Sequence, residues 1–291
     1  MAFIKNTTYL FVDGSNFRQY FNDYTQKWFE QEVEFDFQKI KHYFLAEKAF
    51  YYDCIDDIKR DSETDQEFEE RKILQEEKLN RIREVEGCHV HLGSLRKAKK
   101  LKKRGQKEVD VMLAVQMMEH AFRGNMNKAV LLSGDLDFRP LVESLVRFGL
   151  FVEIAGDKNH ISSDLIHSAD SHRKLDFNNY FQWTSDSLKI KKPLEINTLT
   201  FFPERASEDG FHCIKKGICN NSEIKVFIRN GINDFWLYTP NFINKKTALV
   251  INNTDNSILK VNSKNLLSLK SFQKLDLYHT LMYGEIDWVK D

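Results

Sequence analysis

The stretch "AVLLSGDLDFRPLVESLVRFGLFVEIAG" (129–156) places two short apolar runs, 129–133 and 151–155, on either side of an amphipathic segment, 139–149. Apolar runs of this length are typical of buried strands, whereas the intervening segment has helical spacing and ends at a glycine. A strand, a helix and a second strand with connections this short form a parallel pair with a right-handed crossover. The stretch therefore predicts an α/β domain built on a parallel sheet.

The same alternation extends toward the N-terminus. Three more strand-like runs are "TYLFVD" (8–13), "AFYYD" (49–53) and "CHVHL" (88–92), each separated from the next by a helix-length segment. "VMLAVQMMEHAF" (111–122) is apolar nearly all round and is expected to be a buried crossover helix. The charge-dense segment 56–87 is expected to form a long solvated helix. Together these segments predict a doubly wound parallel sheet of five strands.

The pattern changes after residue 180, where alternation of strands and helices stops. "SEIKVFIRNGINDFWLYTP" (222–240) has apolar residues at alternate positions on both sides of Asn230-Gly231, a dipeptide favoured in type I′ hairpin turns. Residues 247–263 have the pattern of a second hairpin. We therefore expect a first domain over 1–180, a linker over 181–192 and a small, mostly β C-terminal domain over 193–291, in which no catalytic constellation stands out.

The composition excludes several classes of protein. Lys plus Arg and Asp plus Glu each number 43, so the net charge of +0 provides no global attraction to nucleic acid or to an anionic membrane. Four scattered cysteines are too few for a disulfide-rich secreted fold, and a hairpin explains Cys213, Cys219 and the adjacent His212 better than zinc does. The sequence has no signal-peptide pattern and no window near the roughly 18 apolar residues of a membrane span. A cytoplasmic protein with reduced thiols is expected.

Four acidic residues stand at strand ends or helix starts of the first domain. Asp13 ends the first strand, Asp110 opens the expected crossover helix, and Asp135 and Asp137 follow the fourth strand. The carboxyl ends of strands in an open parallel sheet flank the crevice in which ligands bind. If the strand order is 3-2-1-4-5, strands one and four are neighbours, so Asp13 lies beside Asp135 and Asp110 can reach both.

Clustered carboxylates repel one another unless a cation neutralises them, and ligation by oxygen atoms alone suits Mg²⁺ or Mn²⁺. Such an ion activates water and stabilises charge on a phosphoryl group, as phosphodiester hydrolysis requires. Each acid also has a structural interpretation: Asp13 as a turn residue before Gly14, and Asp110 as a helix N-cap. Their shared position at one end of the sheet favours a common site.

Other chemistries that use an aspartate after a strand fit less well. A haloacid-dehalogenase-type phosphatase needs an acid where this chain has Ser15, and a D-x-S-x-S adhesion site needs a serine where it has Phe17. The chain also lacks the glycine-rich loops that bind dinucleotides and nucleoside triphosphates.

Five segments together resemble the NYN domain, the LabA-like branch of the PIN-like ribonuclease superfamily, over residues 7–177. They are "YLFVDGSNF", "AFYYD", "KEVDVMLAVQMM", the stretch 129–156 and "LIHSAD", in the order and spacing of that family. The resemblance implies a metal-dependent endoribonuclease with strand order 3-2-1-4-5. It also implies RNA rather than DNA as the substrate. The residues themselves support only a phosphodiester and do not distinguish the two nucleic acids.

The resemblance also implies roles for individual residues. Asp13, Asp110 and Asp135 correspond to metal-site acids, Asp137 to a further acid, Asn16 to a polar partner of substrate or metal, and Ser133 to a residue that orients the site. Gln116 stands nearest the place where family members often carry another acid, which puts a two-metal site in doubt. This departure motivates an alternative function, a catalytically inactive nucleic-acid-binding or scaffold protein that retains the fold.

Substrate contacts are expected in the basic stretch "RKAKKLKKRGQK" (96–107), which precedes Asp110. Its charges would contact phosphate without reading sequence, although most charge runs are solvated loops. Arg139 fits equally a phosphate contact and a helix start. The proposed substrate-binding residues are Arg96, Lys97, Lys99, Lys100, Lys102, Lys103, Arg104 and Arg139. Phe17, Tyr20 and Phe21 follow the D-G-S-N motif, and their helical spacing favours positions in the core over base stacking. The C-terminal domain is expected to bind substrate or a protein partner, and homo-oligomerisation is left open.

Overall fold

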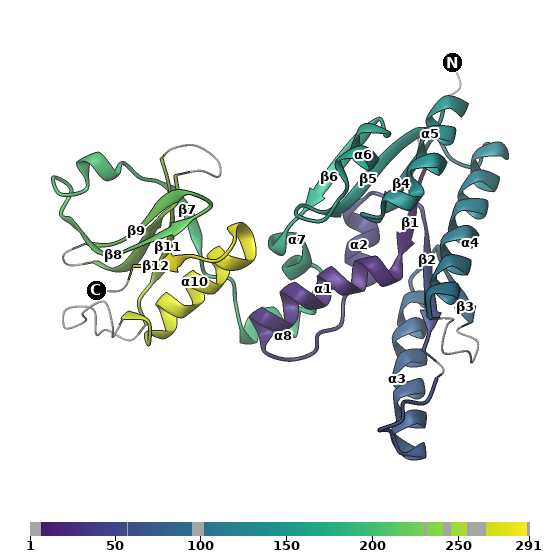
Figure 1. Ribbon diagram of the computed structural model, residues 1–291, viewed down its shortest axis with the longest axis horizontal. Helices are drawn as coiled ribbons and strands as arrows, with labels where there is room; N and C mark the ends of the chain where they lie inside the picture. The colour runs from purple at the N-terminus through teal and green to yellow at the C-terminus, as the bar shows by residue number, and fades with distance from the viewer. Residues whose placement is uncertain are drawn as a thin grey trace. The chain divides into compact units, whose positions relative to one another are not determined.

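The computed structural model describes residues 7–56, 58–94, 102–229, 232–240, 246–254 and 266–289, with only the backbone at 94, 102–107 and 232. The chain divides into two compact units, Met1–Asp186 and Ser187–Asp291 (Figure 1). The expected linker, 181–192, includes the end of one short helix and all of another, α8 (Asp186–Lys191).

The first unit is built on a parallel sheet of six strands in the order β3-β2-β1-β4-β5-β6. The strands are β1 (Thr8–Asp13), β2 (Lys48–Ile55), β3 (Cys88–Ser94), β4 (Lys128–Leu132), β5 (Phe151–Asp157) and β6 (Ser171–Leu175). This arrangement confirms the predicted fold class and the order of the first five strands. The sequence does not predict β6, because its segment "SHRKL" has a single apolar residue and pairs only at the edge of the sheet.

Helices cover both faces of this sheet (Figure 1). They are α1 (Gly14–Phe29), α2 (Phe37–Tyr43), α3 (Asp65–Arg83), α4 (Lys102–Phe122), the short helix η1 (Leu136–Phe138), α5 (Arg139–Phe148), α6 (Ser163–His167) and α7 (Phe177–Gln182). One core lies between the sheet and the pair α4 and α5, with Phe11, Leu131 and Leu145 buried in it. On the other side α1 packs against β1, β2 and α7.

The helix α4 differs from the sequence prediction in two ways. It begins at Lys102 rather than at Asp110, because the residues before Asp110 are themselves good helix formers. It is also not buried all round: Val111, Val115 and Phe122 are 61%, 59% and 62% exposed. Asp110 therefore lies well inside the helix and is not its N-cap.

The second unit is an antiparallel sheet in the order β12-β8-β9-β10-β11-β7. Its strands are β7 (Asn197–Thr200), β8 (Phe211–Cys219), β9 (Ser222–Arg229), β10 (Ile232–Tyr238), β11 (Thr247–Asn252) and β12 (Asp287–Trp288), and α10 (Lys270–Tyr283) packs on β10 and β11. The predicted pairing of β9 with β10 is present. The Asn230-Gly231 turn and the far arm of the second expected hairpin lie outside the described residues.

Candidate functional site

Asp13 is the last residue of β1 and the N-cap of α1. Its Oδ1 accepts hydrogen bonds from Ser15 Oγ at 3.0 Å and from the Asn16 backbone N–H at 3.1 Å, and its Oδ2 accepts one from Ser133 Oγ at 3.0 Å. Burial raises the pKa of Asp13, these hydrogen bonds lower it, and the nearby charge of Asp135 raises it again. The carboxyl group is thus placed where its negative charge is costly.

The turn after β4 is joined to Asp13 by two polar links. Ser133 Oγ, besides donating to Asp13, accepts the Asp135 backbone N–H at 3.2 Å. Asn16 Oδ1 accepts the Gly134 backbone N–H at 3.1 Å. The motifs D-G-S-N and S-G-D, far apart in the sequence, therefore form one hydrogen-bonded network at the carboxyl edge of neighbouring strands.

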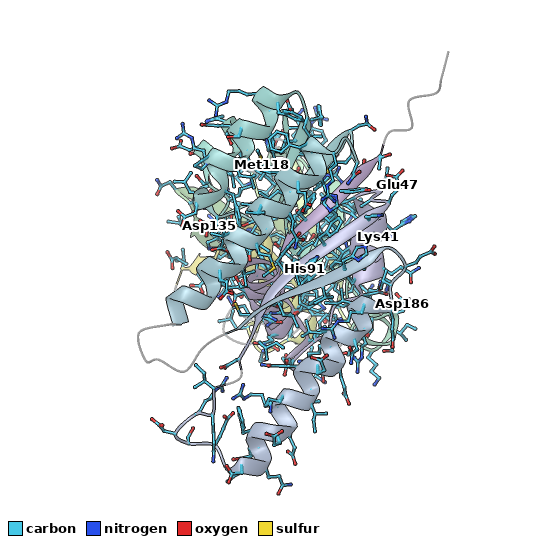
Figure 2. The ribbon with its side chains drawn as sticks, turned by 90° about the vertical axis from the view of Figure 1, so that its right-hand side faces the viewer. Lys41, Glu47, His91, Met118, Asp135 and Asp186 are labelled. Carbon is cyan, nitrogen blue, oxygen red and sulfur yellow. The ribbon has the colours of Figure 1, made fainter. Side chains whose placement is uncertain are left out.

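Asp110 and Asp137 line a second feature, a groove of about 890 Å³ between α4 and α5. Its other lining residues are mostly apolar and include Met118, labelled on α4 in Figure 2, and Phe122. Asp137 is exposed, and its backbone N–H donates to Asp135 Oδ1 at 2.9 Å. The structure thus places Asp13 near Asp135 and joins Asp137 to Asp135 through its backbone, while Asp110 lines the same groove as Asp137.

The donor set around Asp13 and Asp135 consists of carboxylate, amide and hydroxyl oxygens, which hard divalent cations prefer. Asp13 and Asp135 lie close enough for one charge to raise the pKa of the other carboxyl, a repulsion that a cation would relieve. Mg²⁺ often binds through one or two carboxylates and keeps several waters, so the pair fits such an ion. Within the described part of the chain, no three His, Cys, Asp or Glu side chains are grouped closely enough to hold a metal.

Gln116 lies on α4 and faces β2 and β3. Its Oε1 accepts the Tyr52 hydroxyl at 2.8 Å, and its Nε2 lies 3.3 Å from Nδ1 of His91, a residue labelled in Figure 2. The side chain nearest the place of a further family acid therefore takes part in a neutral contact between a helix and the sheet.

Few of the predicted substrate contacts can be located. Arg96, Lys97, Lys99 and Lys100 lie outside the described residues, as do the side chains of Lys102, Lys103 and Arg104. Arg139 begins α5, and its guanidinium pairs with Glu143 at 2.7 Å and approaches Asp164 at 3.8 Å.

Sequence reasoning missed Asp53, near the end of β2 beside Asp13. The carboxyl group is buried and paired with the Arg18 guanidinium, whose Nη2 donates at 2.9 Å, and it also accepts the Tyr51 hydroxyl at 3.0 Å. Burial raises the pKa of Asp53, and the Arg18 charge opposes that rise. The signal was present in "AFYYD", where an acid ends an apolar run, but its partner lies 35 residues away.

A second missed acid is Asp157, the last residue of β5 and only 1% exposed. Its Oδ1 accepts the Asn159 backbone N–H at 3.0 Å and lies 2.7 Å from His160 Nδ1. Buried acids therefore occupy the carboxyl ends of β1, β2 and β5, and Asp135 follows β4. Of these four acids, the sequence identifies only Asp13 and Asp135 as site residues.

None of the described helices is long and apolar enough to cross a membrane.

No curated protein matches the chain. Among solved structures, a protein of unknown function from Vibrio parahaemolyticus is 20% identical with a TM-score of 0.42, and the match covers 60% of this chain and 96% of that one. The sequence profile of the NYN domain matches residues 7–176. NYN domains have a PIN-like nuclease fold, and by this match the chain belongs to the NYN domain family.

Proposed function

We propose that the first unit is a Mg²⁺- or Mn²⁺-dependent endonuclease that hydrolyses phosphodiester bonds in RNA. The observation that carries the proposal is the network joining Asp13, Ser133 and Asp135 at the carboxyl edge of β1 and β4. The chain places β2 and β3 on one side of β1 and β4, β5 and β6 on the other, so the strand order reverses between β1 and β4. Open α/β sheets bind ligands at the carboxyl edge of such a switch point. RNA as the substrate rests on the family.

Asp13 and Asp135 would hold the ion, with Asp110 and Asp137 as further carboxylates. Such an ion supplies an activated water and stabilises charge on the phosphoryl oxygens. Ser133 and Asn16 keep the two acidic turns in register through their hydrogen bonds to Asp13 and Gly134. In the reaction, water oxygen bonds to phosphorus, the bond from phosphorus to the leaving sugar oxygen breaks, and that oxygen takes a proton.

The first experiment measures cleavage of labelled single-stranded RNA, duplex RNA and single-stranded DNA by the full chain with Mn²⁺, Mg²⁺ or EDTA. We expect metal-dependent cleavage of RNA that falls at least 100-fold in Asp135→Asn, because this change keeps the shape of the side chain and removes its charge. Asp61→Asn, at an exposed loop position, is the matched control and should cleave normally. Undiminished cleavage by Asp135→Asn would overturn the proposed site.

A second function, an inactive nucleic-acid-binding or scaffold module, is favoured by Gln116. Its amide oxygen accepts a hydrogen bond from Tyr52 and its amide nitrogen lies near His91, at the position nearest to where the family resemblance implies a further acid. Binding of RNA without cleavage under every metal condition would favour this alternative. In either case we propose that the protein acts in the cytoplasm, that it belongs to the LabA-like branch, and that the second unit binds substrate or a protein partner.

A further inference from the structure

Two aromatic rings from distant parts of the first unit stack on each other. Tyr20 lies on α1, His160 follows β5, and their ring centroids are 4.7 Å apart with an angle of 21° between the planes. Phe17 and Phe21, the neighbours of Tyr20 on the helix, are buried in the core as expected. Tyr20 itself is only partly buried, so the expectation that all three are core residues is wrong for this one.

The His160 ring is held in place and still presents surface to solvent. Its Nδ1 lies 2.7 Å from Oδ1 of Asp157, a carboxylate that is 1% exposed, and one face of the ring is covered by Tyr20. The His160 side chain nevertheless remains 55% exposed. An aromatic ring whose orientation is set by two contacts loses little freedom when something stacks on it.

This pair borders the acidic network. A Cβ atom at Gly134 would lie 3.4 Å from the His160 carbonyl oxygen and 3.3 Å from Ile161 Cα, so the turn after β5 packs directly on the turn that carries Asp135. Burial and the charges of Asp157, Asp23, Asp135 and Asp13 raise the pKa of Tyr20, which places its hydroxyl near the same acids.

We propose that the stacked pair Tyr20–His160 is a subsite for one unpaired nucleobase next to the phosphate held at the acidic network. Stacking on an aromatic ring accepts any base, because every base has a π face. A base in a duplex is already stacked and paired, so the subsite selects single-stranded or looped nucleic acid. The inference rests on the proposed function only in requiring that nucleic acid binds at this edge.

The test measures binding rather than cleavage. A fluorescent single-stranded RNA oligonucleotide and the same sugar–phosphate chain without bases are titrated, in Ca²⁺ and again in EDTA, with the full chain, His160→Ala, His160→Phe and Tyr20→Ala. His167→Ala, an exposed histidine at the end of α6, is the matched control. Thermal unfolding of each variant establishes that it folds.

We expect His160→Ala to weaken binding of the oligonucleotide with bases at least about fivefold, the lower end of one stacked base. It should leave binding of the base-free chain unchanged. His160→Phe should restore most of the affinity, because it keeps a ring that stacks on Tyr20 although it loses the contact with Asp157, and Tyr20→Ala should match His160→Ala.

Equal losses on both ligands would overturn the subsite, since the contact would then be to phosphate. A His160→Phe variant as weak as His160→Ala would also overturn it, because the ring nitrogens would then matter. If the folded wild-type protein binds neither ligand in Ca²⁺ or in EDTA, the subsite and the proposed nucleic-acid substrate fail together. If RNA cleavage is normal but binding does not depend on bases, only the subsite fails.

Discussion

At the scale of single residues, the Asp13 carboxylate is both costly and stabilised. Asp13 is only 5% exposed and lies beside a second acid, Asp135, so its charge is unfavourable for folding. The hydrogen bonds from Ser15, Asn16 and Ser133 offset part of that cost. Retention of a charge where burial opposes it is typical of functional sites. Stability and function should therefore respond in opposite directions when the charge is removed.

We predict that Asp13→Asn stabilises the metal-free protein at neutral pH while it abolishes cleavage. Because the folded-state pKa of Asp13 is raised above 3.8, the folded protein binds more protons than the unfolded chain just above that pH. The contribution of Asp13 to stability therefore decreases as the pH rises through this window. Asn does not titrate, so its advantage should be small near pH 4 and larger at pH 7.

Urea unfolding of wild-type and variant protein in EDTA at both pH values measures this difference. A variant less stable than wild type at pH 7 would show that the lost acceptor geometry outweighs the removed charge.

At the scale of elements, the site depends on how closely α1 approaches the sheet. A Cβ atom at Gly14 would lie 2.6 Å from Tyr51 Cζ and 2.7 Å from the Tyr52 carbonyl oxygen, much closer than carbon atoms can approach. Tyr51 is fully buried and hydrogen-bonded to Asp53, so its ring cannot move aside freely. Glycine is required here by the packing of a helix start on β2.

Gly14→Ala should therefore destabilise the protein by about 1–3 kcal/mol, the usual cost of overpacking a core. It should also lower activity, since the shifted helix carries Asn16. Gln19→Ala, at an exposed position of the same helix, should change stability by no more than about 0.5 kcal/mol. Urea denaturation measures the free energy of unfolding of both variants. Equal stability of Gly14→Ala and Gln19→Ala would refute the packing argument.

At the scale of the whole molecule, the net charge of +0 means that affinity for a polyanion must come from local patches. The basic stretch 96–107 is the densest of these in the sequence. Its contribution remains a prediction from sequence, because all of its side chains lie outside the described residues.

We predict that replacing Arg96, Lys97 and Lys99 with Gln weakens RNA binding and its dependence on salt. Each lost phosphate contact on a single strand reduces the slope of log affinity against log salt concentration by about 0.7, so the three together should reduce it by about 2. Replacement of Lys27, Arg81 and Arg83, which are exposed on helices α1 and α3 of the first unit, removes the same charge elsewhere and serves as the control. Equal slopes in wild type and the first variant would exclude this stretch as the substrate track.

The sequence by itself determined the alternation of strands and helices, the first five strands and the two acidic motifs, because apolar periodicity and short motifs are local properties. It did not determine where α4 begins, or that Gln116 bonds Tyr52, because both depend on the surroundings of the helix. Only the tertiary structure paired Arg18 with Asp53 and stacked Tyr20 on His160. These contacts join residues far apart in the chain, and no local pattern encodes which distant side chains the sheet edge brings together.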